Sequence, residues 1–169
     1  MRIISLIILA NLYILSVSAQ AQEQQKHIGP LHFTKMKVSS ETYESVGVLD
    51  VNADGHPDLV SGAFWYAGPT FIQRHFIAEV NRVQEYWDDF ASIPLDVNGD
   101  GRMDVITGGW FGATLFWLEN PGNNGPWQRH VIDSTGNIEA ARAYDIDGDG
   151  LVEIIPNTPG HALKYYKLV

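Results

Sequence analysis

Three short segments of this 169-residue chain place oxygen-bearing side chains at alternate positions around a glycine. They are DVNADGHPD from Asp50, DVNGDGRMD from Asp96 and DIDGDGLVE from Asp145. Counted from the leading aspartate, acidic or amide residues occupy positions 1, 3, 5 and 9, and glycine occupies position 6. Calcium takes about six to eight oxygen ligands, which converging carboxylates can supply. The spacing therefore predicts calcium-binding loops.

The glycine at position 6 is expected to adopt the positive φ that keeps such a loop curled. A backbone carbonyl from position 7 and the side chain at position 9 would complete the cage. An EF-hand is excluded because it needs a bidentate glutamate at position 12, which is Ser61, Thr107 or Pro156 here. The alternative is that the segments are Asx-rich turns that need no metal.

The loops belong to a longer repeat, since their leading aspartates are 46 and 49 residues apart. A second motif follows the first two loops: FWYAGPTFIQRHFI from Phe64 and FWLENPGNNGPWQRHVI from Phe116. The third copy ends early, at ALKYYKLV. Short β-branched and aromatic runs flank every loop, and about four strands in ~40–45 residues is the size of a propeller blade. We therefore expect an all-β fold, a partial β-propeller of about three four-stranded blades with calcium-binding hairpin loops.

These motifs resemble the FG-GAP and VCBS calcium-loop repeats, which are related to the blades of integrin α-chain heads. The resemblance covers roughly residues 42–169 and implies a propeller with calcium in the hairpin turns. By position, it implies metal sites formed by Asp50, Asn52, Asp54, His56 and Asp58; by Asp96, Asn98, Asp100, Arg102 and Asp104; and by Asp145, Asp147, Asp149, Leu151 and Glu153. Glu153 departs from the usual aspartate, and Ala53 replaces a common glycine.

The N-terminal residues predict an exported protein. Residues 1–21 have a positive start, an apolar run and small residues suited to cleavage, as in a secretory signal peptide. We expect a secreted or periplasmic chain with no stable membrane span after signal removal. Residues 22–41 form an N-terminal segment in which His32–Val38 could be a closing outer strand, and residues 42–169 hold blades at about 44–80, 86–133 and 138–169. The chain has no cysteine, and its net charge of −9 argues against nucleic acid as a partner.

No common catalytic motif is present, and the sequence favours a non-catalytic carbohydrate or protein interaction module. The segment QEYWDDFASIP is the one candidate ligand site, in which Trp87 would stack on a sugar and Asp88 or Asp89 would bond hydroxyls. The alternative for this segment is an acidic connecting turn with a packed tryptophan. The pattern also resembles propeller domains of carbohydrate-active proteins such as the aldos-2-ulose dehydratases, which implies a lyase as a second reading.

The number of repeats raises a question of assembly. A closed propeller needs about four to eight blades, whereas three acidic loops are present. The chain is then a shortened structural remnant of a larger propeller, an open arc, or a unit that completes a ring by self-association.

Overall fold

The computed structural model describes residues 32–169, and all regular secondary structure among them is β-strand. The chain divides into two compact units, Met1–Met36 and Lys37–Val169. The predicted signal peptide and the first half of the N-terminal segment lie outside the described residues. The strand expected at His32–Val38 is absent. Phe33 and Met36 are 91% and 81% exposed, so these apolar side chains lack the packing that a paired strand would give them.

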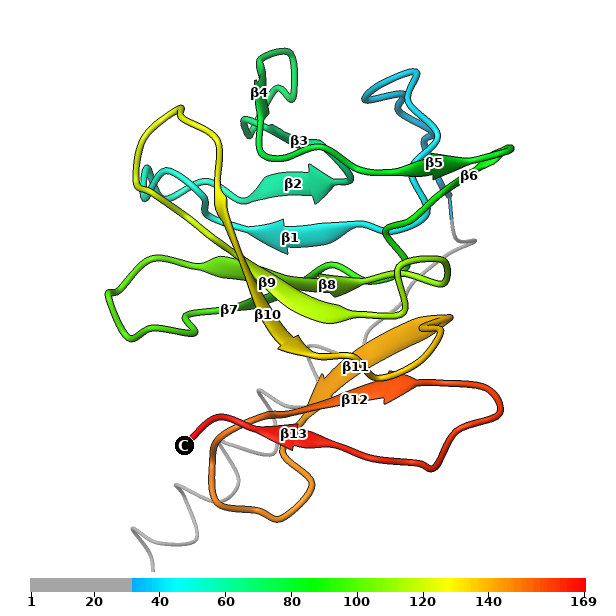
Figure 1. Cartoon of the computed structure of the whole chain (residues 1–169). Coiled ribbons are helices and arrows are strands. Elements are labelled where there is room, and N and C mark those ends of the chain that lie inside the picture. The colour runs from blue at the N-terminus through cyan, green and yellow to red at the C-terminus, as the bar shows by residue number, and fades with distance from the viewer. Residues whose placement is uncertain (1–31) are drawn as a thin grey trace, which may run out of the picture. The chain divides into compact units, whose positions relative to one another are not determined.

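Three antiparallel sheets make up most of the Lys37–Val169 unit (Figure 1). The first sheet contains β1 (Gly47–Leu49), β2 (Asp58–Ser61), β3 (Phe64–Tyr66) and β4 (Arg74–Phe76). The second contains β7 (Ile93–Leu95), β8 (Asp104–Gly108), β9 (Leu115–Glu119) and β10 (Gln128–Asp133). The third contains β11 (Ala140–Tyr144), β12 (Glu153–Asn157) and β13 (Tyr166–Lys167). Each sheet keeps its strands in sequence order, as a meander.

The repeat predicted from the sequence is visible in this topology. Each acidic segment connects the first two strands of its sheet, β1 to β2, β7 to β8 and β11 to β12. The first two sheets have four strands, and the third has three. The all-β class is therefore confirmed for the described residues. Three sheets fall short of the four blades that a closed propeller needs.

The second sheet shares a core with each of its neighbours. Its first strand, β7, contacts both β1 and β11. Two clusters of buried apolar side chains fill the two interfaces. One joins sheets one and two and includes Val60, Trp65, Val105 and Leu118. The other joins sheets two and three and includes Ile106, Leu115, Ile138 and Ile154. Successive residues of a strand point to opposite faces, so Val105 and Ile106 on β8 serve different cores.

A small hairpin, β5 (Arg82–Val83) with β6 (Tyr86–Trp87), lies in the connection between the first two sheets. From the sequence we expected a ligand site or an acidic connecting turn here, and no hairpin. Its strands have two residues each, and its turn places Gln84 at φ 58°. Neither glycine nor proline marks this turn in the sequence, which explains why the prediction omitted the hairpin.

Candidate functional site

The position-1 aspartate organises each acidic loop in the same way. Its Oδ2 atom accepts a hydrogen bond from the N–H of the position-6 glycine, and the N–O distance is 2.9 Å in all three copies. Further N–H groups of all three loops bond the Oδ1 atom of the same carboxylate. The donors and acceptors of the shared bond are Gly55 with Asp50, Gly101 with Asp96, and Gly150 with Asp145.

The position-5 aspartate stabilises the second half of each loop through a backbone hydrogen bond. Its Oδ1 atom accepts the N–H of position 7 at 2.9, 2.9 and 3.0 Å in the three loops. This bond is the main cause that lowers the pKa values of Asp54 and Asp100. For Asp149 the hydrogen bond from Lys167 is the larger cause of a lowered pKa. These exposed carboxylates therefore favour the charged form that a cation requires.

The predicted positive φ at position 6 is confirmed, with values of 85°, 83° and 91° at Gly55, Gly101 and Gly150. The residue at position 4 is also left-handed. Gly99 and Gly148 take φ 73° and 79°, whereas the first loop forces Ala53 to φ 58°. A residue with a Cβ is strained in this region. The first loop therefore adopts the same backbone conformation as the other two, although its residue at position 4 is an alanine that disfavours it.

The position-9 carboxylates are fully buried at the start of the second strand. Asp58 accepts the N–H groups of Val51 and Gly68 at 2.8 and 2.7 Å. Asp104 makes the same pair of bonds, to Val97 and Asn120 at 3.0 and 2.8 Å. Burial is the main cause that raises the pKa of Asp104. In the structure, these two residues fasten the loop to the turn that follows the third strand.

Glu153 occupies the equivalent position in the third loop but satisfies only one of its oxygens. Its Oε2 atom accepts the N–H of Ile146 at 2.9 Å. The Oε1 atom is buried without a hydrogen bond, and it lies 3.4 Å from the ammonium of Lys167. The same ammonium donates to Asp147 and Asp149, both at 2.6 Å. These two bonds raise the pKa of Lys167.

The donor sets of the loops suit calcium. Every side-chain ligand expected from the sequence is a carboxylate or amide oxygen, the type that calcium prefers. Among the described residues, ligand atoms of Asp145, Asp147 and Asp149 lie within 4.8 Å of one another. The other two loops carry an asparagine at position 3, so they gather fewer carboxylates there. The buried and unbonded Oε1 atom of Glu153 is a further oxygen that a cation would satisfy.

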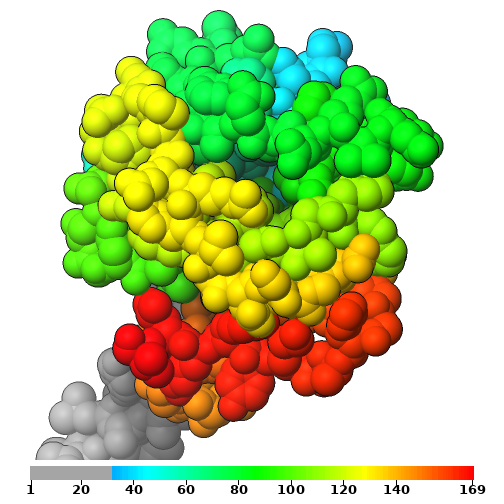
Figure 2. Space-filling model, viewed as in Figure 1, coloured from blue at the N-terminus to red at the C-terminus, as the bar shows by residue number. Residues whose placement is uncertain are grey.

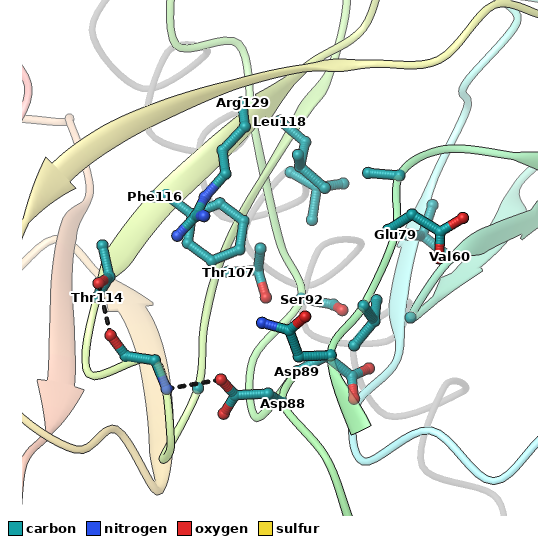
Figure 3. A pocket seen from close by; sticks show the side chains of 17 residues that line it. Val60, Glu79, Asp88, Asp89, Ser92, Thr107, Thr114, Phe116, Leu118 and Arg129 are labelled. Carbon is teal, nitrogen blue, oxygen red and sulfur yellow. Dashed lines mark hydrogen bonds between the residues drawn. The ribbon is translucent and has the colours of Figure 1, made fainter. Parts of the chain in front are cut away.

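A pocket of about 250 Å³ lies between the first two sheets, lined partly by the connection between them. In the space-filling view, a hollow separates the segment around β3–β6 from β10 (Figure 2). Apolar walls come from both sheets, and the polar lining includes Glu79, Asp88, Asp89 and Arg129 (Figure 3). The guanidinium of Arg129 stacks on Phe116 at 3.9 Å from the ring centroid.

Only two of the three predicted ligand residues line this pocket. Trp87 instead packs on Tyr43, with ring centroids 4.8 Å apart, and its Nε1 donates to Thr42 at 3.3 Å. Asp88 lines the pocket, but its two oxygens accept the N–H groups of Phe111 and Gly112 at 2.8 and 2.7 Å. Figure 3 shows the second of these bonds. Asp88 therefore fixes the β8–β9 turn.

Asp89 is the most perturbed carboxyl at the pocket. It is 4% exposed, and its Oδ1 atom accepts the N–H of Glu44 at 3.1 Å. Its Oδ2 atom is buried without a partner. Burial, followed by the nearby Glu44 charge, raises the pKa of Asp89 to about 6. One oxygen of Asp89 therefore holds the segment before β1 through a hydrogen bond, and the other oxygen has no hydrogen-bond partner.

The fold and the acidic hairpins define an all-β protein built from repeated antiparallel sheets. Residues 96–155 match the family model for the FG-GAP-like repeat, which confirms the FG-GAP resemblance over these residues. The matched region runs from the second acidic loop to the strand after the third, and this part of the chain is similar to an FG-GAP-like repeat. No curated protein matches the chain, and no solved structure matches it.

Sequence reasoning missed two residues that shape the loops. Asn120 is 1% exposed and donates from Nδ2 to the Val51 carbonyl at 2.9 Å, which ties the second sheet to the first. Lys167 contacts three carboxylates of the third loop. The only signal for Asn120 was its place before Pro121, matching Gly68 before Pro69 in the first copy. Lys167 had no signal, because its partners are 14–20 residues away.

Proposed function

We propose that this chain is an exported, non-catalytic interaction module whose acidic hairpin loops bind calcium. The observation that carries the proposal is the common loop scaffold. In all three copies the position-1 and position-5 carboxylates are held by backbone N–H groups at matching distances. Such preorganisation reduces the entropic cost of gathering several oxygens around one ion.

The residues that would hold calcium are those at positions 1, 3, 5 and 9 of each loop, with a backbone carbonyl from position 7. The ion would supply positive charge to loops that contain three, three and four carboxylates. The loops connect strands within each sheet, so a bound ion would oppose the separation of the paired strands. We therefore assign calcium a structural role.

A non-catalytic role is supported by the contacts of the two acidic pocket residues. Asp88 uses both oxygens to hold a turn, and Asp89 is latched to Glu44. The second oxygen of Asp89 is buried, so neither residue presents an exposed, unpaired oxygen to a substrate. The pocket, with its mixture of apolar walls and polar groups, is the place where we propose that a carbohydrate or part of a protein partner binds.

Export and ring completion are further parts of the proposal. Residues 1–21 have the composition of a secretory signal, which favours a secreted or periplasmic location. Residues 32–169 contain no helix with the length and hydrophobicity to cross a membrane. Since three sheets are fewer than the blades of a closed propeller, we propose that another copy or partner completes the ring.

Thermal unfolding of the full chain, in millimolar calcium and in excess chelator, tests the metal assignment. A bound ion stabilises the folded state by RT ln(1 + [L]/Kd), about 2.7 kcal/mol per site at a hundredfold excess over Kd. We expect the melting temperature to rise by several degrees with calcium. Magnesium at the same concentration is the control, because it demands tighter octahedral geometry and keeps its water. A melt that is the same in calcium and chelator would reject calcium binding.

A further inference from the structure

The three loops share a scaffold, but the residue on the neighbouring strand differs in charge. In the third sheet, Lys167 on β13 pairs with Glu153, the position-9 residue on β12. The registers of the other sheets, continued by one residue, place Ala67 opposite Asp58 and Glu119 opposite Asp104. The position that faces the loop is therefore neutral in the first copy, negative in the second and positive in the third.

Side chains at this strand position reach the loop when they are long enough. The Oε1 atom of Glu119 accepts a hydrogen bond from Asn98, at position 3 of the second loop, at 3.3 Å. The ammonium of Lys167 bonds Asp147, at position 3 of the third loop, at 2.6 Å. Ala67 ends at its Cβ and leaves the first loop without a neighbour of this kind.

The Lys167 ammonium lies where the carboxylates of the third loop converge. It is 2.6 Å from Asp147, 2.6 Å from Asp149 and 3.4 Å from the Oε1 atom of Glu153. That Oε1 atom is buried and has no hydrogen bond. A buried charge is costly unless an opposite charge compensates it. The ammonium is the one cationic group in contact with Glu153 among the described residues.

This inference rests on the calcium sites proposed above and narrows them to the first two loops: we propose that Lys167 is the cation held by the third loop. Calcium then binds the first and second loops and enters the third only by displacing the ammonium. The two cations exclude each other because both need the oxygens of Asp147 and Asp149. An exchange also separates Lys167 from three carboxylates at once.

The arginine of the second loop does not play the same part. Arg102 pairs with a single loop carboxylate, that of Asp100. Its Nε atom donates to the carbonyl of Asn120 at 3.0 Å, which holds the side chain on the following turn. The carboxylate of Glu119, on the neighbouring strand β9, also reaches the second loop and adds a negative charge beside it. Arg102 therefore leaves most of the second loop's acidic groups without a protein cation.

Calcium stoichiometry of the full chain, measured by isothermal titration calorimetry and native mass spectrometry, tests the proposal. The matched variants are Asp54→Ala, Asp100→Ala and Asp149→Ala, which remove the position-5 carboxylate from each loop. We expect two ions in the wild type, one in Asp54→Ala, one in Asp100→Ala and still two in Asp149→Ala. Three ions in the wild type, or a loss in Asp149→Ala, would overturn the proposal and leave calcium binding intact.

The variant Lys167→Met supplies the converse test. It keeps the aliphatic stem and removes the charge, so we expect a third ion to bind and the stabilisation by calcium to increase. Lys164→Met is the control, because Lys164 bonds the carbonyl of Thr135 away from the acidic loops. A count that stays at two in Lys167→Met would reject Lys167 as the excluding group. A wild type that binds no calcium would reject both this proposal and the calcium sites themselves.

Discussion

The carboxylates of the acidic loops have different structural roles, although their spacing along the chain is the same in every loop. The position-5 aspartates are exposed and bond a backbone N–H of their own loop, whereas Asp58 and Asp104 are 0% exposed and join two segments of backbone. A sequence pattern fixes the order of these residues but not their burial. The spacing therefore indicated metal ligands at position 9 and gave no sign that these side chains also support the sheet.

Asp89 provides a prediction about pH. Its pKa is about 6 in the folded chain and 3.8 in its unperturbed state. Between about pH 4 and pH 6 the unfolded chain loses this proton before the folded chain does, so the free energy of unfolding falls as the pH rises. The total loss is about 3 kcal/mol at roughly 1.4 kcal/mol per pKa unit. We expect Asp89→Asn to remove this loss, as measured by urea unfolding in chelator across that range.

Asp133→Asn is the control for the Asp89 measurement. The hydroxyl of Tyr166 bonds Asp133 at 2.6 Å and lowers the pKa of Asp133. The contribution of Asp133 to stability is therefore present at neutral pH and is lost as the pH falls, opposite in sign to that of Asp89. Asp133→Asn should lower stability at neutral pH and leave the Asp89 slope in place. If Asp89→Asn has the wild-type slope, the buried carboxyl does not carry the effect.

At the scale of strands, the histidine of the repeated Arg-His motif stacks on a tryptophan of the neighbouring strand in each of the first two sheets. His75 stacks on Trp65 across β3 and β4, with centroids 4.2 Å apart and planes at 20°. His130 stacks on Trp117 across β9 and β10 at 4.4 Å and 17°. Both histidines therefore have structural contacts between paired strands. Cross-strand pairs of this kind are what stabilises an antiparallel sheet.

A double-mutant cycle measures this contact. We expect His130→Ala and Trp117→Leu to be coupled by about 0.5–1.5 kcal/mol, the range for aromatic pairs. The cycle also separates the stack from the contact of His130 with Glu119 at 2.7 Å, because that contact is lost in both variants that lack the histidine. Chemical denaturation of the wild type, the two single variants and the double variant supplies the four free energies. Additive effects would mean that the rings do not interact energetically.

The strands that the sequence predicted are those with strong local signals. Alternating β-branched and aromatic residues on either side of each glycine-containing loop identified the pairs β1–β2, β7–β8 and β11–β12. The hairpin β5–β6 and the strand β13 were harder to predict from the sequence, because two-residue strands are too short to show a hydrophobic periodicity. Long-range contacts were beyond reach for a different reason. Whether Trp87 faces the pocket or Tyr43 depends on packing, which spacing along the chain does not encode.

At the scale of the whole Lys37–Val169 unit, the second sheet couples the other two. The buried clusters on its two sides share adjacent residues of β8, and the bond from Asn120 to the Val51 carbonyl adds a polar link to the first sheet. Linear repeats tend to unfold as separable units when their interfaces are weak. Here each interface contains a continuous apolar cluster, which favours one cooperative transition over three independent ones.

Truncation of adjacent β8 residues tests this cooperativity. We expect Ile106→Ala to cost about 2–5 kcal/mol and Val105→Ala somewhat less, since each leaves a cavity in a different core. Val131→Ala is the matched control on β10, where the side chain is 63% exposed, and its effect should stay within about 0.5 kcal/mol. Tryptophan fluorescence and far-ultraviolet circular dichroism should give coincident unfolding curves in every variant, because both cores melt together. If Ile106→Ala splits the transition while Val105→Ala does not, the third sheet unfolds on its own and the second sheet couples only to the first.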